Sequence, residues 1–224
     1  MAPRNTSIQR TQHLPATGRR ERRRAEIRDR IFRAALRLFA ERGFLETTVE
    51  DITEAADVGK GTFFNYFPTK EHVLATLGAA RLAVIERARE RAKVGPVLPT
   101  LKHLAIELAG HSSDSPALLR AIYAAHASCE PVRAELLRRL HEGRRLLAEI
   151  YQIAQERGEV RRDQSAADLA RLTQIVFLGA ILAWAMNPDS TLRKTAEQVW
   201  DVFSAGFRVD PKRRRAEEQR STGP

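Results

Sequence analysis

Several features that mark other classes of protein are scarce or missing in this 224-residue sequence. Cys129 is its single cysteine, which excludes an internal disulfide and favours a reducing compartment. The longest uninterrupted apolar run covers residues 175–186, well short of the ~18 residues that span a bilayer. The first 24 residues are polar and rich in arginine, without the apolar core of a secretory signal. We therefore expect a cytoplasmic protein with no membrane segment.

Positive charge is abundant, with a formal net charge of +10, and it is unevenly placed. Residues 1–93 contain 19 Lys and Arg against 12 Asp and Glu, whereas residues 94–207 contain 13 of each. A solvated surface would explain the charge but not its segregation. A basic first third on a neutral body instead suggests a nucleic-acid-binding module joined to a part with another task.

The hydrophobic pattern predicts an all-α fold, because apolar residues recur at every third or fourth position and no long alternating run is present. We expect a disordered basic arm over residues 1–20 and a disordered basic tail over residues 208–224. A first helix should end at Gly43, and Thr47 should then cap a short helix with Glu50 at its third position. A long helix begins at Thr69 and should be the only continuous link to the later part of the chain. Further helices are expected at about 100–111, 115–128, 131–157, 165–186 and 191–207.

The stretch VGKGTFFNYFPTK, residues 58–70, allows two interpretations. A phosphate-binding loop would need a glycine at position 54, a Ser or Thr at position 61, and a preceding buried strand. The sequence instead has Glu54, Gly61 and an amphipathic helix. Two short helices joined by a tight turn at Asp57, which tolerates a left-handed backbone, predict a helix-turn-helix over about residues 48–67.

The segment from Gly43 to Leu74, GFLETTVEDITEAADVGKGTFFNYFPTKEHVL, resembles the N-terminal domain of the tetracycline-repressor (TetR) family of bacterial regulators. The resemblance implies a three-helix DNA-binding domain over residues 21–68 and a helical ligand-binding and dimerisation domain over residues 69–207. It also implies a palindromic DNA operator that a small-molecule effector releases. The sequence departs from the family pattern at Asp57, Gly59 and Phe64. The DNA-facing positions that the resemblance implies are Thr47, Thr48, Lys60, Gly61, Thr62, Phe64, Asn65, Tyr66 and Lys70.

A cluster of arginines precedes the first helix, and such arms bind phosphates or enter a minor groove. The alternative is a solvated tail that attracts DNA without fixed geometry. The residues concerned are Arg19, Arg20, Arg22, Arg23 and Arg24.

Residues 175–186 are apolar on every side, so a helix there needs cover on two faces. A second copy of the chain would supply one cover, and complete burial inside one chain is the alternative. The stripe expected to face the second copy comprises Leu172, Val176, Gly179 and Ala183, together with Val199 and Phe203 of the last helix.

A second set of side chains is expected either to line a pocket for an apolar or aromatic effector or to be plain core. It comprises Tyr123, His126, Phe177, Ile181 and Trp184.

Two groups of residues contain atoms that bind metals, but neither forms a tight ligand motif. His103, Glu107 and His111 share one helical face, which is equally typical of a surface His–Glu pair, and His126 lies one turn from Cys129. We expect no metal, no cofactor and no catalytic residues.

The sequence predicts a homodimeric, ligand-responsive, nucleoid-associated repressor. An architectural or division-linked DNA-binding protein without an effector and a small helical metalloenzyme remain the alternatives.

Overall fold

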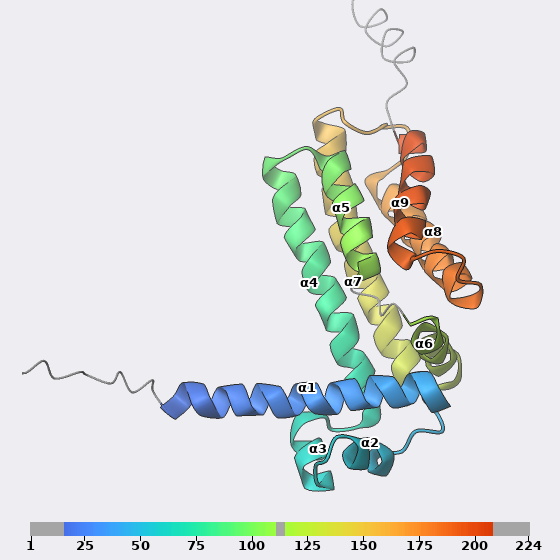
Figure 1. Cartoon of the computed structure of the whole chain (residues 1–224). Helices are drawn as coiled ribbons and strands as arrows, with labels where there is room; N and C mark the ends of the chain where they lie inside the picture. The colour runs from blue at the N-terminus through green and yellow to red at the C-terminus, as the bar shows by residue number, and fades with distance from the viewer. Residues whose placement is uncertain (1–15, 111–114, 208–224) are drawn as a thin grey trace, which may run out of the picture.

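The fold is all-α across residues 16–110 and 115–207, the part of the chain that the computed structural model describes (Figure 1). No strand occurs in these residues, which confirms the predicted fold class. The elements are α1 (Ala16–Arg42), α2 (Val49–Ala55), α3 (Lys60–Tyr66), α4 (Lys70–Val94), α5 (Val97–Gly110), α6 (Pro116–Ser128), α7 (Glu130–Glu156), α8 (Ala166–Met186), α9 (Leu192–Phe203) and a 3₁₀ turn η1 (Ser204–Phe207).

The helices α1, α2 and α3 pack around a small apolar core. Ile31, Ala35 and Phe39 of α1 are fully buried there, together with Phe63 in the middle of α3 and Phe67 at its C-cap. The turn between α2 and α3 passes through Asp57 with φ 50°, the left-handed conformation that the sequence predicted. The two short helices thus form the predicted helix-turn-helix.

The predicted capping residue of α2 was wrong by one position. Thr48, not Thr47, is the N-cap, and its hydroxyl accepts the Asp51 backbone N–H at 3.1 Å. The Asp51 carboxylate accepts the Thr48 backbone N–H at 2.8 Å, which closes a capping box. Thr47 lies one residue earlier and is fully buried.

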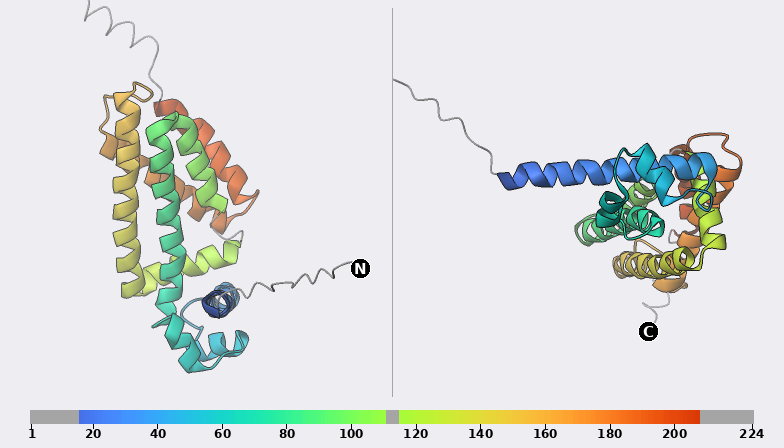
Figure 2. Two further views of the ribbon diagram at one scale, coloured as in Figure 1. Left: turned by 90° about the vertical axis from the view of Figure 1, so that its left-hand side faces the viewer. Right: turned by 90° about the horizontal axis from the view of Figure 1, so that it is seen from below.

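The N-terminal arm also differs from its prediction. Residues 16–20 are helical, because α1 begins at Ala16 and continues without a break to Arg42. Its first turns project away from the rest of the molecule in both views (Figures 1 and 2). The remaining arm, residues 1–15, and the tail, residues 208–224, lie outside the described residues.

The second part of the molecule is a bundle built on α4 and α7. These two long helices lie side by side (Figure 2). Their close approach uses Gly143 of α7, where a Cβ would come within 3.1 Å of Ile85 Cδ1. The helices α5, α8 and α9 complete the bundle. The buried Tyr151 hydroxyl and the Thr173 hydroxyl share a hydrogen bond of 2.6 Å between α7 and α8.

Helix α6 belongs to both parts of the molecule. Leu118, Ala121 and Ala125 on one of its faces are buried in the same apolar cluster as α1, α2 and α3. Helix α4 is the continuous link that the sequence predicted, but it is not the only attachment between the two parts. The helix-turn-helix is attached to the bundle through α4 and, independently, through the packing of α6 against α1.

Helix α8 combines an apolar sequence with an exposed apolar surface. By length and composition alone it is apolar enough to cross a membrane, and only 28% of its most apolar window is buried inside the chain. One side packs on α6, α7 and α9, while Ile175 and Met186 are more than half exposed. Exposed apolar surfaces of this kind typically mark a site of interaction with another protein or a membrane.

Candidate DNA-binding surface and ligand cavity

The outward side of α3 carries the side chains that the sequence assigned to DNA. Lys60, Gly61 and Asn65 are exposed, and half of the Phe64 surface is exposed. Thr62 and Tyr66 are half-buried at the edges of this surface. The buried Phe63 and Phe67, with ring centroids 5.9 Å apart, fix which side of α3 faces outward.

An exposed ion pair connects the beginnings of α2 and α3. The Lys60 ammonium binds the Glu50 carboxylate, and this hydrogen bond holds the pKa of Glu50 below its usual range. Both side chains are more than half exposed. A carboxylate therefore lies within the surface that is predicted to meet phosphates.

Two side chains that were predicted to contact DNA, Thr47 and Lys70, are instead hydrogen-bonded within the chain. The Thr47 side chain is fully buried, and its hydroxyl donates to the Gly43 carbonyl at 2.7 Å, so a DNA contact through this side chain is excluded in this conformation. The Lys70 ammonium donates to the carbonyls of Phe44, Leu45 and Thr47 at 2.9, 3.1 and 2.9 Å. Three donors are all that an ammonium has, so Lys70 fastens the start of α4 to the loop before α2.

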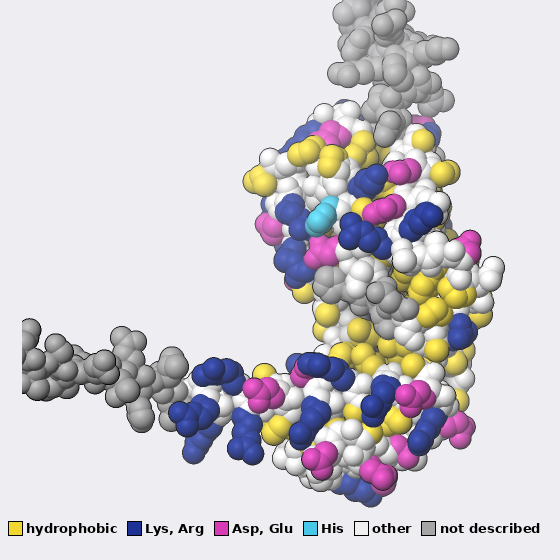
Figure 3. Space-filling view, viewed as in Figure 1, with side chains coloured by type: hydrophobic (Ala, Val, Ile, Leu, Met, Phe, Trp, Pro, Cys, Tyr) yellow, Lys and Arg dark blue, Asp and Glu magenta, His cyan; other side chains and the backbone are white. Residues whose placement is uncertain are grey.

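The arginines of the predicted arm are all exposed, but they lie on α1 and not on an irregular tail. Figure 3 shows Lys and Arg side chains gathered along the projecting part of this helix. Further along, the Arg28 guanidinium lies 5.7 Å from the centroid of the Phe67 ring, at the end of α3. The basic part of α1 thus reaches the end of α3.

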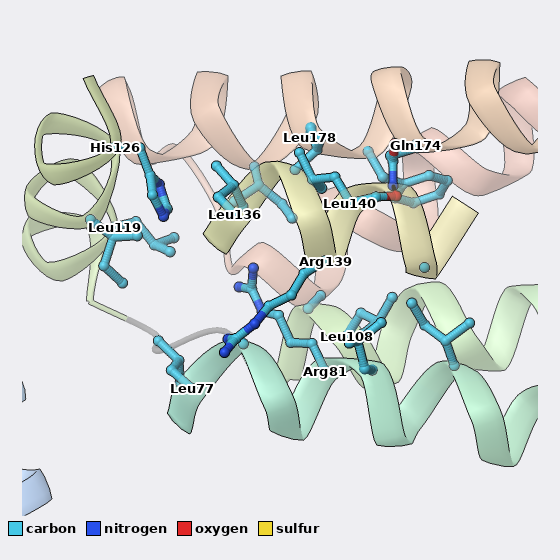
Figure 4. A pocket seen from close by; sticks show the side chains of 18 of the residues that line it. Leu77, Arg81, Leu108, Leu119, His126, Leu136, Arg139, Leu140, Gln174 and Leu178 are labelled. Carbon is cyan, nitrogen blue, oxygen red and sulfur yellow. Dashed lines mark hydrogen bonds between the residues drawn. The ribbon is translucent and has the colours of Figure 1, made fainter. Parts of the chain in front are cut away.

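A large cavity lies between α4, α5, α6, α7, α8 and α9, with a volume of about 820 Å³ (Figure 4). Its walls are mostly aliphatic, with leucines from all six helices. Among the predicted pocket residues, Tyr123, His126, Phe177 and Ile181 all line it. Trp184 does not, because its ring is buried against α6 and α9 and its Nε1 donates to the Ser190 carbonyl at 2.7 Å. The tryptophan in the wall is Trp200 of α9, which the sequence pattern did not single out.

Polar groups gather in one part of this cavity. The side chains of Arg81 from α4 and Arg139 from α7 extend toward each other, and His126 of α6 lies beyond them (Figure 4). Arg139 is ion-paired to Glu135, and it lies across Gly78, where a Cβ would leave no room for its guanidinium. The buried His126 Nδ1 has no hydrogen-bond partner among the described residues. Burial, and secondly the charge of Arg81, lower the pKa of His126 and thereby favour its neutral imidazole.

The exposed apolar face of α8 contains part of the predicted dimer stripe. Leu172, Gly179 and Ala183 are exposed, while Val176 and Val199 are half-buried. Phe203 turns inward onto Phe207, with ring centroids 4.5 Å apart, so it does not face outward as predicted. Large apolar side chains outside the predicted stripe extend the face, namely Ile175, Leu182, Met186 and Val202.

Of the candidate metal ligands, Glu107 and His103 of α5 lie beside two arginines of α4. The Glu107 carboxylate accepts from Arg87 at 2.8 Å and from Arg91 at 3.1 Å, while His103 Nε2 lies 3.7 Å from it. His111 lies outside the described residues. Within residues 16–110 and 115–207, no three His, Cys, Asp or Glu side chains are grouped to hold a metal ion.

Comparison with known proteins agrees with this architecture. Residues 31–77 match the family model described as "Bacterial regulatory proteins, tetR family". The repressor DhaR of Mycobacterium sp. (strain GP1) is 30% identical over 165 residues, which cover 71% of this chain and 82% of DhaR. The repressor KstR of Mycobacterium tuberculosis is 26% identical over 71% of both chains.

Solved structures show the same likeness. The tetR-family repressor FadR of Thermus thermophilus, crystallised with lauroyl-CoA, is 34% identical and has a TM-score of 0.58, covering 82% of this chain and 96% of FadR. NalD, a repressor of a multidrug efflux pump in Pseudomonas aeruginosa, has a TM-score of 0.68 at 22% identity, with coverage of 84% and 99%. At that identity NalD supports the fold alone.

Proposed function

Because this chain belongs to the tetR family of bacterial regulatory proteins, we propose that it is a homodimeric repressor that an apolar effector releases from a palindromic operator. Regulation of transcription through a helix-turn-helix is the activity common to its named relatives. One observation supports the ligand-responsive part of the proposal most strongly. Helix α6 lines the cavity with one face and packs into the core of the helix-turn-helix with another.

The DNA contacts are proposed for the exposed side of α3. Asn65 is exposed and carries an amide that can bond an adenine edge with two hydrogen bonds. Phe64 offers an apolar ring to a thymine methyl, and Lys60 near the N-terminus of α3 suits a phosphate. Thr48 at the cap of α2 is also exposed, but its hydroxyl donates to the Asp51 carboxylate at 2.6 Å, so a phosphate contact through this hydroxyl would have to replace that bond.

The effector is proposed to have a long or bulky apolar body and one polar end. The aliphatic walls and the volume of about 820 Å³ suit an apolar body of considerable size. Arg81 and Arg139 would receive the polar end, and the unpartnered His126 Nδ1 would hydrogen-bond it. The relative FadR was crystallised with lauroyl-CoA, whose acyl chain has this character, and acyl thioesters are therefore the first class to test.

The coupling between the cavity and DNA follows from two helices that each face both sites. Leu74, Leu77 and Arg81 of α4 line the cavity, while Lys70 at the start of α4 holds the loop before α2. Leu119 and Tyr123 of α6 line the cavity, while Leu118 and neighbouring residues pack against α1. A ligand that favours one position of α4 and α6 changes the spacing of the two recognition helices in a dimer, and operator half-sites tolerate only one spacing.

A second copy of the chain is the proposed cover for the exposed face of α8. Homodimerisation through α8 would bury the exposed leucines and Met186 and place two helix-turn-helices about a twofold axis. A soluble, cytoplasmic protein follows from this assignment. We propose no enzymatic activity, since Glu107 is engaged by two arginines and the relatives named above are regulators.

The proposal is tested by selecting genomic fragments with the purified full chain, followed by titration of the selected operator. Asn65→Ala should reduce the affinity ratio between operator and scrambled duplex, by about 1–3 kcal/mol at one base pair if Asn65 reads a base. Asn187→Ala, far from α3 in the loop after α8, is the matched control and should retain the ratio. A wild-type protein that selects no sequence, or that binds all duplexes equally, would refute operator-specific regulation and leave the architectural alternative.

A further inference from the structure

The function proposed above gives no role to the projecting part of α1. Residues 19–26 and 28–30 are exposed, and Ile31 is the first fully buried residue of the helix. At 1.5 Å per residue, the exposed segment extends about 18 Å beyond the core. It points away from the side of the molecule where α8 and α9 lie (Figures 1 and 2). Any binding partner of this exposed segment must therefore lie outside the chain.

One side of this segment carries a basic stripe, which we define as Arg20, Arg24 and Arg28. These residues recur at every fourth position, and the same side of the helix continues into Ile31 and Ala35, which are fully buried in the apolar cluster that α1 shares with α2, α3, α4 and α6. The basic stripe therefore faces the same way as the core stripe.

The inner end of the basic stripe is fixed by contacts next to the recognition helix. The Arg28 guanidinium lies over the ring of Phe67, the C-cap residue of α3, and its Nη2 donates to Thr76 Oγ1 at 3.4 Å. Arg24 and Arg20 follow one and two turns further out. The basic stripe thus starts beside α3 and runs outward for about 12 Å, a length that matches three to four phosphates along one DNA strand.

The outer arginines of the basic stripe are available for an anionic partner. Within the described residues, neither Arg20 nor Arg24 takes part in an ion pair. Asp29, an acidic residue of the same segment, is engaged by Arg33 on another side of the helix. The segment from residue 16 to residue 30 contains seven arginines and three acidic residues, so its net charge attracts polyanions.

We propose that the basic stripe binds the backbone phosphates of DNA that flanks each operator half-site, outside the base pairs that α3 reads. The proposal rests on the function proposed above, because the position of α3 on DNA defines where the flank begins. In a dimer formed through α8, the two stripes point away from each other, and they therefore reach the two outer flanks and not the centre of the operator. The stripe adds affinity without sequence preference, since phosphates carry no sequence information.

The test compares two duplexes that contain the operator selected from genomic fragments. One duplex extends about one helical turn beyond each half-site, and the other ends at the half-site borders. Wild type should bind the extended duplex more tightly. The double variant Arg20→Ala/Arg24→Ala should bind both duplexes equally, and its salt slope on the extended duplex should be smaller by about 0.9 for each phosphate that it no longer neutralises.

The matched control is the double variant Arg19→Ala/Arg22→Ala, which removes the same charge from the same two turns but from the opposite side of α1. It should retain the preference for the extended duplex and its salt slope. Circular dichroism should show equal helix content in both double variants. The conservative pair Arg20→Lys/Arg24→Lys should keep the flank contact.

Two results would overturn the proposal that the basic stripe binds flanking DNA. One is an equal reduction of the salt slope in both double variants, which would show a diffuse effect of charge. The other is wild type binding the extended and the trimmed duplex alike. Failure of the proposed function is distinguishable from both results, because wild type would then select no operator at all. Without an operator, the proposal for the basic stripe would also fail.

Discussion

The Lys70 ammonium donates a hydrogen bond of 2.9 Å to the Thr47 carbonyl and thereby joins the first residue of α4 to the segment before α2. The same ammonium binds the carbonyls of Phe44 and Leu45 and lies 4.7 Å from the centroid of the Phe44 ring. Thr47 itself is buried and bonded to Gly43. One side chain of α4 therefore holds the loop before the helix-turn-helix.

Lys70→Met should lower the free energy of unfolding by about 1.5–3 kcal/mol, because three carbonyls lose a charged donor. Denaturant titration measures this change. Lys102→Met, which removes a lysine paired with Asp201 on the surface, should change stability by no more than about 0.5 kcal/mol. An unchanged stability with a salt slope of DNA binding reduced by about one unit would instead place the Lys70 ammonium on a phosphate.

Glu50→Gln should raise the affinity for the operator by about two- to fivefold at low salt, since it removes a carboxylate from the DNA-facing surface and releases Lys60. Fluorescence anisotropy at two salt concentrations checks this. Glu197→Gln breaks a similar exposed ion pair, with Arg193 on α9, and should leave the affinity unchanged. Weaker binding by Glu50→Gln would mean that the ion pair orients Lys60 for DNA.

Gly179→Leu should convert the dimer to a folded monomer. A Cβ on Gly179 meets no atom within 4 Å inside the chain, so the monomer accepts a larger side chain, whereas a close interface between two α8 helices does not. Ala124→Leu, at an exposed position of α6, is the control. Sedimentation that shows an intact dimer for Gly179→Leu would move the interface to another surface.

The helices and the turn between α2 and α3 were predictable because they depend on local periodicity and on single residues such as Asp57, Gly43 and Gly158, all of which adopt positive φ. The cap of α2 was not, because Thr47 with Glu50 and Thr48 with Asp51 have the same spacing. Burial of Thr47 by residues distant in sequence decides between them. The start of α1 was missed because arginine and glutamate favour helices without leaving an apolar period.

The cavity was predictable in part. A helical repeat identifies which residues share a stripe, and Phe177 and Ile181 indeed face the cavity together. Whether a stripe meets a cavity or a neighbouring helix depends on tertiary packing, which separated Trp184 from the wall and brought Trp200 into it. The dual role of α6 involves contacts with α1, far away in the sequence, and no local pattern encodes them.

His126→Gln should make the protein less sensitive to mild acid. The pKa of His126 in the folded state lies below its ordinary value of 6.5, so the unfolded state binds the proton more readily. Its contribution to stability is complete above about pH 6.5 and is lost as the pH falls toward the lowered pKa. Glu135, with a pKa of about 2, acts only in a lower range. Denaturant titrations between about pH 7.5 and 5 measure how the free energy of unfolding changes with pH. His141→Gln, outside the cavity, is the control, and parallel curves for wild type and His126→Gln would contradict the expectation.

The most direct test of a ligand-operated repressor is calorimetric titration of an acyl thioester, lauroyl-CoA first, into the full chain with and without saturating operator. Ala180→Phe, which fills the cavity wall, should abolish binding and so confirm where the ligand sits. If ligand and operator favour different positions of α4 and α6, operator must weaken ligand binding by the same factor by which ligand weakens operator binding, about 5- to 150-fold for ordinary coupling. A cavity ligand that binds with equal affinity in the presence and absence of operator would contradict the coupling.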